Sequence, residues 1–343
     1  MEQPKKTNIA KNLLFVVIML AVVLIVVFSL NDISLILEAV KTANGRLILL
    51  AVLVYLGYVF TTNLALHFVT TGLGIKLPFL DSMAIGSAEY FFNGITPFSS
   101  GGQPFQAYFY VKKGVSGDNA MSILMSNFIV YQVIMTVMST LGLILFYRDI
   151  KDVLNQYMFL ILIGYVANMS VLAILISIST IPGISKVFEW LFRTVGKIKF
   201  LTKSMQKLEN RTFDFVKEFQ IGMGLLFKRK RVLIGASLLR VLGLSLLHSV
   251  PYVIFLALGV SLDMSDLIFV ISMSLFSTTF MMWVPTPGAS GGTEWAFTVI
   301  FTSLVSGATT ILVTSMLIWR FVTYYLGMLI GFIAYIVLRK RGI

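Results

Sequence analysis

The sequence predicts an all-α polytopic membrane protein with about six full spans and two broken or re-entrant helical hairpins. Hydrophobic residues make up 57% of the 343 residues, charged residues only 12%, and the mean hydropathy is +0.91. A soluble domain usually carries about twice that charged fraction. In addition, several charge-poor stretches reach the roughly 20 apolar residues that cross a bilayer, and a short motif occurs twice at breaks in such stretches.

Six charge-poor segments are long enough for full spans: 13–30, 47–71, 119–147, 157–181, 232–260 and 308–338. Three lysines precede the first segment, as in a signal peptide, but no small-residue cleavage site follows it. Its 18 apolar residues also exceed the usual signal core of about 7–15, so we expect a retained span. Cysteine is absent and the two histidines are far apart, so disulfides and thiolate metal sites are excluded and we expect no metal site.

Two further pairs of apolar segments are each broken by a stretch rich in proline, glycine and serine. The first pair is 82–95 and 104–111, and the second is 267–284 and 292–306. Broken segments of this kind often form hairpins or discontinuous helices at a transport site. We therefore expect an N-terminal membrane half (1–181) with a hairpin at about 79–117, a basic linker (182–231), and a C-terminal half (232–343) with a hairpin at about 266–306.

The distribution of lysine and arginine predicts the orientation. Each broken pair returns the chain to the side from which it came, so six spans place both termini on the same side. With the termini inside, the cytoplasmic segments hold 21 basic residues and the outside loops hold four, namely Lys41, Arg46, Arg148 and Lys151. Because cytoplasmic loops are enriched in basic residues, we expect a multi-pass plasma-membrane protein with both termini cytoplasmic.

The segment 182–231 is the one substantial hydrophilic stretch, with twelve basic residues against four acidic ones. Apolar residues recur in it at helical spacing, which predicts an amphipathic helix on the membrane surface: Phe188, Leu191, Phe192 and Val195. Its charge is explained equally well by attraction to anionic lipid and by the ordinary positive charge of inside loops. Neither explanation indicates a nucleic-acid partner.

A seven-residue motif occurs in both broken pairs, at a constant offset of 190 residues, with five of seven positions identical. Because three long spans separate the copies, they enter from opposite faces, and we infer an inverted repeat. The shared residues are Thr96, Pro97, Ser100, Gly101 and Gly102 in the first copy and Thr286, Pro287, Ser290, Gly291 and Gly292 in the second.

The composition of the motif indicates exposed backbone at membrane depth. Proline removes a hydrogen-bond donor and breaks the helix, while glycine lets a ligand approach closely. Unpaired backbone is tolerated there only against protein or a water-filled cavity. Helices beginning near Gly102 and Gly292 would direct donors at an anionic group such as a lipid phosphate. The alternative is that both copies are structural kinks without a ligand.

Four charged residues lie within apolar segments: Glu89, Glu294, Arg240 and Arg320. Arg320 lies 12 residues past the start of its span, or about 18 Å at helical rise, so it needs a partner or a cavity. Glu294 and Arg320 form either a structural ion pair or part of a polar path. For Glu89, the sequence is equally compatible with a role in that path and with no role in it. Arg240 either joins the path or reaches the cytoplasmic interface by snorkelling.

The two motif copies and the last span resemble a known family. Residues 91–104, with the sequence FFNGITPFSSGGQP, and residues 285–294, with the sequence PTPGASGGTE, resemble the two signatures of the lysylphosphatidylglycerol synthase transmembrane family. Trp319-Arg320-Phe321 with Tyr324-Tyr325 is similar to the last-span pattern of that family. The resemblance implies a lipid flippase such as the membrane part of the multiple peptide resistance factor, in which a separate soluble domain transfers lysine to phosphatidylglycerol. Because this chain ends five residues after the last predicted span, we expect no transferase domain.

Three functions are compatible with these observations. The leading hypothesis is translocation of an anionic or aminoacylated phospholipid, or of another phosphate-bearing lipid, which in this family contributes to resistance against antimicrobial peptides. The enzyme alternative is phosphatidylglycerol lysyltransferase activity, and the third is a non-transporting partner of a separate lipid-modifying enzyme. No phosphate-binding loop of the Walker type occurs, so we expect neither ATP hydrolysis nor a cofactor. The two histidines, His67 and His248, are expected to be satisfied intramembrane residues rather than catalytic bases.

Overall fold

The computed structural model describes residues 33–154, 158–180, 220–221, 224, 226–281, 284–305 and 308–341. The expected all-α polytopic architecture is confirmed in this part of the chain. The predicted span 13–30 and most of the basic segment 182–231, including its amphipathic helix, lie outside the described residues. In chain order the helices are α2 (Ile33–Thr42), α3 (Gly45–Gly72), α4 (Phe79–Gly94), α5 (Gly102–Lys112), α6 (Gly117–Leu145), α7 (Tyr147–Leu154), α8 (Met158–Thr180), α11 (Lys230–Ala257), α12 (Met264–Met281), α13 (Gly292–Phe301), the 3-10 turn η2 (Thr302–Val305), α14 (Thr309–Arg320), the π-helical turn η3 (Phe321–Tyr325) and α15 (Leu326–Lys340).

Four described helices are long and apolar enough to cross a membrane: Gly45–Gly72, Gly117–Leu145, Lys230–Ala257 and Thr309–Lys340. The last of these combines α14, η3 and α15. A helix of 28 residues measures about 42 Å, more than the roughly 30 Å of a bilayer core. The predicted span 157–181 corresponds to α8, whose most apolar part is shorter, at Leu162–Ile178.

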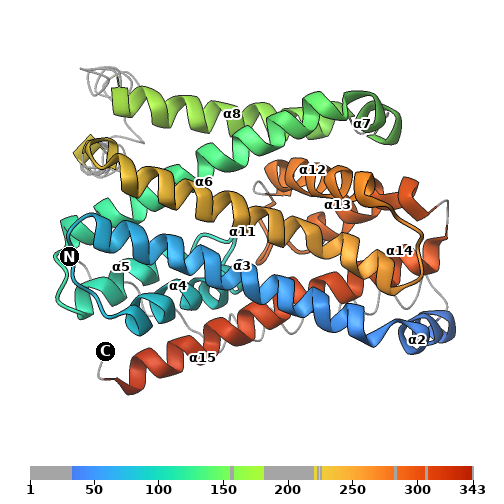
Figure 1. Cartoon of the computed structure of the whole chain (residues 1–343), viewed down its shortest axis with the longest axis horizontal. Coiled ribbons are helices and arrows are strands. Elements are labelled where there is room, and N and C mark those ends of the chain that lie inside the picture. The colour runs from blue at the N-terminus through green and yellow to red at the C-terminus, as the bar shows by residue number, and fades with distance from the viewer. Residues whose placement is uncertain are drawn as a thin grey trace, which may run out of the picture.

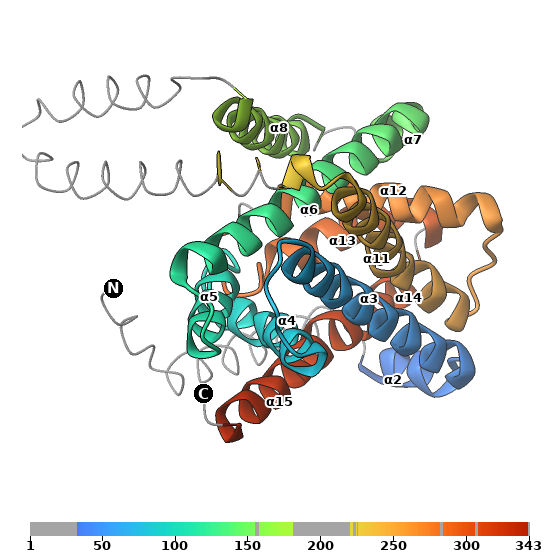
Figure 2. The same cartoon turned by 60° about the vertical axis from the view of Figure 1, so that its left-hand side comes forward.

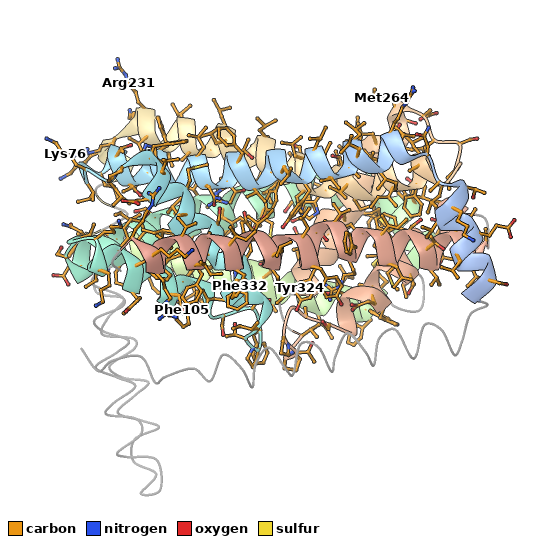
Figure 3. All side chains as sticks on the ribbon, turned by 90° about the horizontal axis from the view of Figure 1, so that it is seen from below. Lys76, Phe105, Arg231, Met264, Tyr324 and Phe332 are labelled. Atoms are coloured by element: carbon orange, nitrogen blue, oxygen red, sulfur yellow. The ribbon has the colours of Figure 1, made fainter. Side chains whose placement is uncertain are left out.

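The long helices run nearly parallel, so the molecule has two opposite ends (Figure 1). Lys76 and Arg231 lie at one end and Met264 lies at the other (Figure 3). We call the end that carries Lys76 and Arg231 the basic end. Two ion pairs there fasten the start of α4 to the ends of α5 and α15. Asp81 accepts hydrogen bonds from Lys113 Nζ at 2.9 Å and from Arg341 at 3.1 Å.

The two broken segments form helical hairpins that approach each other from the opposite ends (Figures 1 and 2). The pair α4 and α5 begins and ends at the basic end, while α12 and α13 begin and end at the end that carries Met264. Their loops meet between the ends, where Pro97 and Pro287 form an antiparallel bridge. In this part of the chain each hairpin therefore re-enters, and the two motif copies lie against one another.

A separate hydrophobic core surrounds each hairpin. The core around the first hairpin contains Phe91 and Phe109, together with residues of α6 and α15. The core around the second contains Phe297, which packs against Phe255 of α11 with 6.0 Å between ring centroids. A third cluster, with Tyr55 of α3 and Val322 of η3, lies between α3, α11 and the last span. The two cores hold each hairpin as a packed unit, and the polar loops lie between them.

Candidate functional site

The loop of the second hairpin is a tight turn closed by its own threonine. Thr286 Oγ1 donates to the carbonyl of Ser290 at 2.7 Å. Three residues of this turn have positive φ, at 58° for Gly288, 54° for Ala289 and 88° for Gly291. The left-handed region disfavours residues with a Cβ, and a Cβ on Gly288 would also enter the ring of Tyr324. The glycine is therefore required both by the backbone conformation and by the approach of the last span.

Arg320 and Glu294 form an ion pair that holds this turn. Arg320 Nε donates to Glu294 Oε1 at 2.7 Å, and the other carboxylate oxygen of Glu294 accepts from the N–H of Gly291 at 2.7 Å. The same guanidinium donates to the Oγ of Ser290 at 3.1 Å and to the carbonyl of Gly288 at 3.3 Å. Arg320 is buried and Glu294 is partly buried. The arginine thus connects the last span to three residues of the second hairpin.

The π-helical turn η3 follows Arg320 directly and brings Tyr324 beneath the same guanidinium. The Cζ of Arg320 lies 4.5 Å from the centroid of the Tyr324 ring, a cation–π distance. The hydroxyl of Tyr324 donates to the carbonyl of Gly94 at 2.9 Å, at the end of α4. Single π-helical turns are frequent at functional sites. Here the turn lets one side chain contact both hairpins.

The loop of the first hairpin is built on the same plan. Thr96 Oγ1 accepts from the N–H of Gly101 at 2.8 Å and donates to the carbonyl of Phe92 at 2.8 Å. Ser100 Oγ donates to the carbonyl of Pro97 at 2.9 Å. Gly102 begins α5, and a Cβ on it would collide with the side chains of Glu89 and Asn93.

Glu89 lies beneath this first turn and is held by neutral amides. It accepts from Gln106 Nε2 at 2.9 Å and from Asn93 Nδ2 at 3.3 Å. Asn93 in turn accepts from the N–H of Gly102 at 2.8 Å. The carboxylate is therefore linked to the glycine turn through Asn93, whereas Glu294 binds its own turn directly.

Arg240 does not snorkel, so that alternative is wrong. Its side chain is buried and donates to Asn127 Oδ1 of α6 at 2.7 Å, with its Cζ 5.7 Å from the centroid of the Tyr131 ring. Its charge acts on Glu89 across the space between them. In the described part of the chain these two side chains form no ion pair with each other, and the Nε of Arg240 is buried without a partner.

The two turns and the last span enclose a small cavity of about 150 Å³. Its walls come from all three parts of the chain: Tyr90, Asn93, Gly94 and Ser99 of the first hairpin, Gly288 of the second, and Thr323, Tyr324 and Gly327 of the last span. Since a water molecule occupies about 30 Å³ of liquid, the cavity has room for a few waters and is too small for a phospholipid headgroup.

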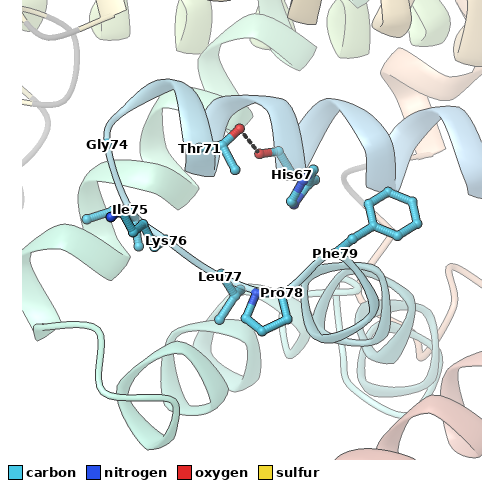
Figure 4. A pocket seen from close by; sticks show the side chains of 8 residues that line it. All are labelled: His67, Thr71, Gly74, Ile75, Lys76, Leu77, Pro78 and Phe79. Carbon is cyan, nitrogen blue, oxygen red and sulfur yellow. Dashed lines mark hydrogen bonds between the residues drawn. The ribbon is translucent and has the colours of Figure 1, made fainter.

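A larger groove of about 740 Å³ lies at the basic end, between the end of α3 and the start of α4 (Figure 4). Its lining includes His67, Lys76 and Phe79. The expectation that both histidines are satisfied is contradicted for one ring nitrogen of each. His67 Nδ1 and His248 Nε2 are buried without a partner, although the Nδ1 of His248 lies 2.8 Å from Ser274 Oγ.

The structure places the shared motif residues, Glu89, Glu294 and Arg320 at the two turns and Arg240 on α11, but sequence reasoning gave no role to several neutral contributors. These residues are Tyr324 and Asn93, which the sequence analysis quoted only as part of the motifs that carry the family resemblance, and Gln106 and Asn127. Attention to charge alone passed over them. A search for amide side chains within apolar segments would have found Asn93 and Asn127.

The fold and this arrangement define a class: a polytopic helical membrane protein with two re-entrant hairpins whose glycine turns meet inside it. The chain belongs to the family described as lysylphosphatidylglycerol synthase TM region, which it matches over residues 12–331. It is also similar to a UPF0104 membrane protein of Archaeoglobus fulgidus. The two are 24% identical over 322 residues, which cover 90% of this chain and 92% of that protein.

Proposed function

We propose that this protein is a lipid translocase that moves an anionic or aminoacylated phospholipid, or another phosphate-bearing lipid, across the bilayer. The observation that carries the proposal is the meeting of two re-entrant turns at the Pro97–Pro287 bridge, beside a small cavity whose lining includes the polar side chains of Asn93, Ser99 and Thr323. Opposed broken helices of this kind form the substrate site of many transporters. A polar headgroup needs such a path, while its acyl tails remain in the lipid.

The cavity is smaller than a headgroup, so translocation requires the two turns to separate. In the described part of the chain, the proline bridge joins the two loops directly, and Tyr324 of the last span adds a hydrogen bond to Gly94 of the first hairpin. Within each hairpin, by contrast, the turn is held by several hydrogen bonds. We expect each hairpin to move as a unit, so that the cavity opens to one end and then to the other.

The groove at the basic end supports access for an anionic headgroup. It lies where Lys76 is exposed and Arg229 donates to the carbonyl of Gly72. Basic residues near a membrane surface attract anionic lipid. We propose that this end is cytoplasmic, that the membrane is the plasma membrane, and that lipid reaches the cavity from this groove.

The test is lipid translocation by the purified full chain in proteoliposomes. Labelled phosphatidylglycerol, its lysyl derivative and a polyprenyl phosphate are compared with empty liposomes. Thr323→Phe fills the cavity and is expected to reduce translocation strongly, while Leu329→Phe on an exposed position of α15 is the matched control.

A folded protein that moves none of the three lipids would contradict the proposal. Synthesis of lysylphosphatidylglycerol by this chain alone would establish the transferase alternative. If the Thr323→Phe variant transported lipid at the wild-type rate, the cavity would not lie on the translocation path.

A further inference from the structure

The two carboxylates beneath the glycine turns are bound in different ways. Glu294 is neutralised by a direct ion pair with Arg320. Glu89 is bound only by the amides of Gln106 and Asn93, which carry no charge. A carboxylate without an ion pair at membrane depth is costly, whereas its protonated form is not. The first hairpin therefore has a carboxyl group whose charge is free to change, and the second does not.

Arg240 provides an independent observation on the same site. It is only 6% exposed, it makes one hydrogen bond to the neutral Asn127, and its Nε is buried without a partner. Arginine has five N–H donors, and a buried donor without a partner is costly. Arg320, by comparison, donates three hydrogen bonds and contacts a carboxylate. Of these two arginines, Arg240 is therefore the one whose guanidinium retains a free N–H donor for a ligand.

We propose that Glu89 and Arg240 form a coupled site, in which Glu89 takes up a proton from water and Arg240 takes up the lipid phosphate. This inference rests on the proposed translocation. While Glu89 is ionised, its charge balances that of Arg240, and the site is neutral. When a proton binds and converts the carboxylate to a carboxylic acid, the site carries one positive charge. A phosphodiester monoanion then restores neutrality, so the proton and the phosphate are taken up together.

The geometry also connects the proton to movement of the hairpin. An ionised carboxylate accepts hydrogen bonds on both oxygens, whereas a carboxylic acid uses one oxygen as a donor. Gln106 and Asn93 both donate to Glu89, so protonation removes one of these bonds or reverses it. Asn93 also accepts from the N–H of Gly102, where α5 begins. A proton on Glu89 therefore loosens the connection between α4 and the glycine turn.

Apart from Arg240 of α11, the groups that act on Glu89 are neutral at physiological pH. The titratable ones that interact with it electrostatically are Tyr58 of α3, Tyr90 of α4 and Tyr131 of α6. The neighbouring α5 contributes the neutral Gln106, and in the described part of the chain α15 adds no group to this set. Arg240 is thus the single charge that a change at Glu89 would unbalance.

The first test measures transport in proteoliposomes with and without an imposed pH gradient. Wild type is expected to move labelled phosphatidylglycerol faster with the gradient. Glu89→Gln is expected to transport at one rate with or without it, and Glu89→Asp to keep the response because it keeps a titratable group. Arg240→Gln is expected to lose about tenfold or more of the rate, because a charge-assisted bond to phosphate is removed.

The second test does not require transport. Infrared difference spectra of the reconstituted full chain, recorded on lowering the pH, are expected to contain a carboxylic-acid band that disappears in Glu89→Gln and remains in the exposed control Glu38→Gln. Short-chain phosphatidylglycerol is expected to raise the Tm of wild type more at acidic pH than at neutral pH, and to have no such effect on Arg240→Gln.

The outcomes separate this inference from the proposed function. Lipid transport that ignores the gradient, or a Glu89→Gln variant that still responds to it, would overturn the coupled site and leave the translocase standing. Absence of lipid transport together with the infrared band and the pH-dependent Tm shift would support the site and reject translocation. The proposed site would be overturned if Glu89→Gln kept the infrared band and Arg240→Gln kept the pH-dependent Tm shift.

Discussion

Replacing Glu294 by glutamine tests whether the ion pair with Arg320 holds the second hairpin in place. The substitution keeps the size of the side chain but removes the negative charge beside a guanidinium that is 7% exposed. Glutamine can still accept one hydrogen bond, from Arg320 or from the N–H of Gly291, both of which lie 2.7 Å from the carboxylate. The main loss is therefore the charge that compensates Arg320.

Breaking a buried ion pair by removing one partner costs about 3–5 kcal/mol, because the remaining charge is left without compensation. The bonds of Arg320 to Ser290 and Gly288 and its contact with the Tyr324 ring remain, so we expect the lower part of that range. In the double variant Glu294→Gln/Arg320→Gln both charges are absent. We expect it to be more stable than the sum of the single losses predicts, by about 2–3 kcal/mol.

The assay is the free energy of unfolding of the purified protein in mixed micelles, followed by tryptophan fluorescence during titration with a denaturing detergent. Glu38→Gln is the matched control, since Glu38 lies exposed on α2 and surface substitutions usually change stability by less than about 0.5 kcal/mol. If Glu294→Gln changes the free energy no more than this control does, and the double-mutant cycle gives no coupling, the ion pair does not hold the hairpin.

Three further predictions follow from other contacts. Gly288→Ala is expected to lower the free energy of unfolding by about 1–3 kcal/mol, because the residue has φ 58° and its Cβ would enter the Tyr324 ring. Gly45→Ala, whose Cβ meets nothing within 4 Å, is the control and is expected to be neutral. The Pro97→Cys/Pro287→Cys variant is expected to form a disulfide, since opposed residues of a non-hydrogen-bonded antiparallel pair have Cα atoms about 4.5 Å apart and the chain contains no other cysteine. It should stop translocation until a reductant is added, and transport by the oxidised protein would refute the proposed separation of the turns. For Asp81, burial acts to raise the pKa, but the hydrogen bonds and charges of Lys113 and Arg341 outweigh it and hold the pKa below the ordinary 3.8. The stability that Asp81 contributes is therefore complete above about pH 4 and lost as the pH falls through the lowered pKa, so the difference in free energy of unfolding between wild type and Asp81→Asn should be constant above that pH and shrink below it.

The bilayer makes some features of this protein easy to predict from its sequence. A span must be long and apolar, so the long helices follow from the length of the charge-poor segments. A charge within such a segment is costly, which is why Glu294 and Arg320 stand out in the sequence, although the sequence is compatible with both an ion pair and a polar path. The repeated motif indicates the two breaks because its proline and its paired glycines, taken together, interrupt a helix.

Neutral polar contacts are not predictable in this way. Asn127 lies 113 residues from Arg240 in the chain, and nothing in the spacing of apolar residues indicates that the two helices place these side chains together. Tyr324 reaches both Arg320 and Gly94 because the chain forms a π-helical turn over Phe321–Tyr325. An aromatic residue in an apolar helix is compatible with any rotation of that helix, so its contact with the turn had no signal in the sequence.

The two halves share their turns but not their charges, and this difference is informative about how the protein works. Both motif copies keep the threonine that closes the turn and the glycines that begin the next helix. If the repeat were purely structural, each turn would need the same clamp. Instead, the second turn is fixed to the last span by Arg320, while the first has a carboxylate bound by amides, and the unpaired Nε belongs to Arg240 on the separate helix α11. The proposed coupled site places the ligand-dependent change in the first hairpin. Substitutions at Glu89 and Arg240 should therefore alter transport more than stability, and substitutions at Glu294 and Arg320 should alter stability more than transport.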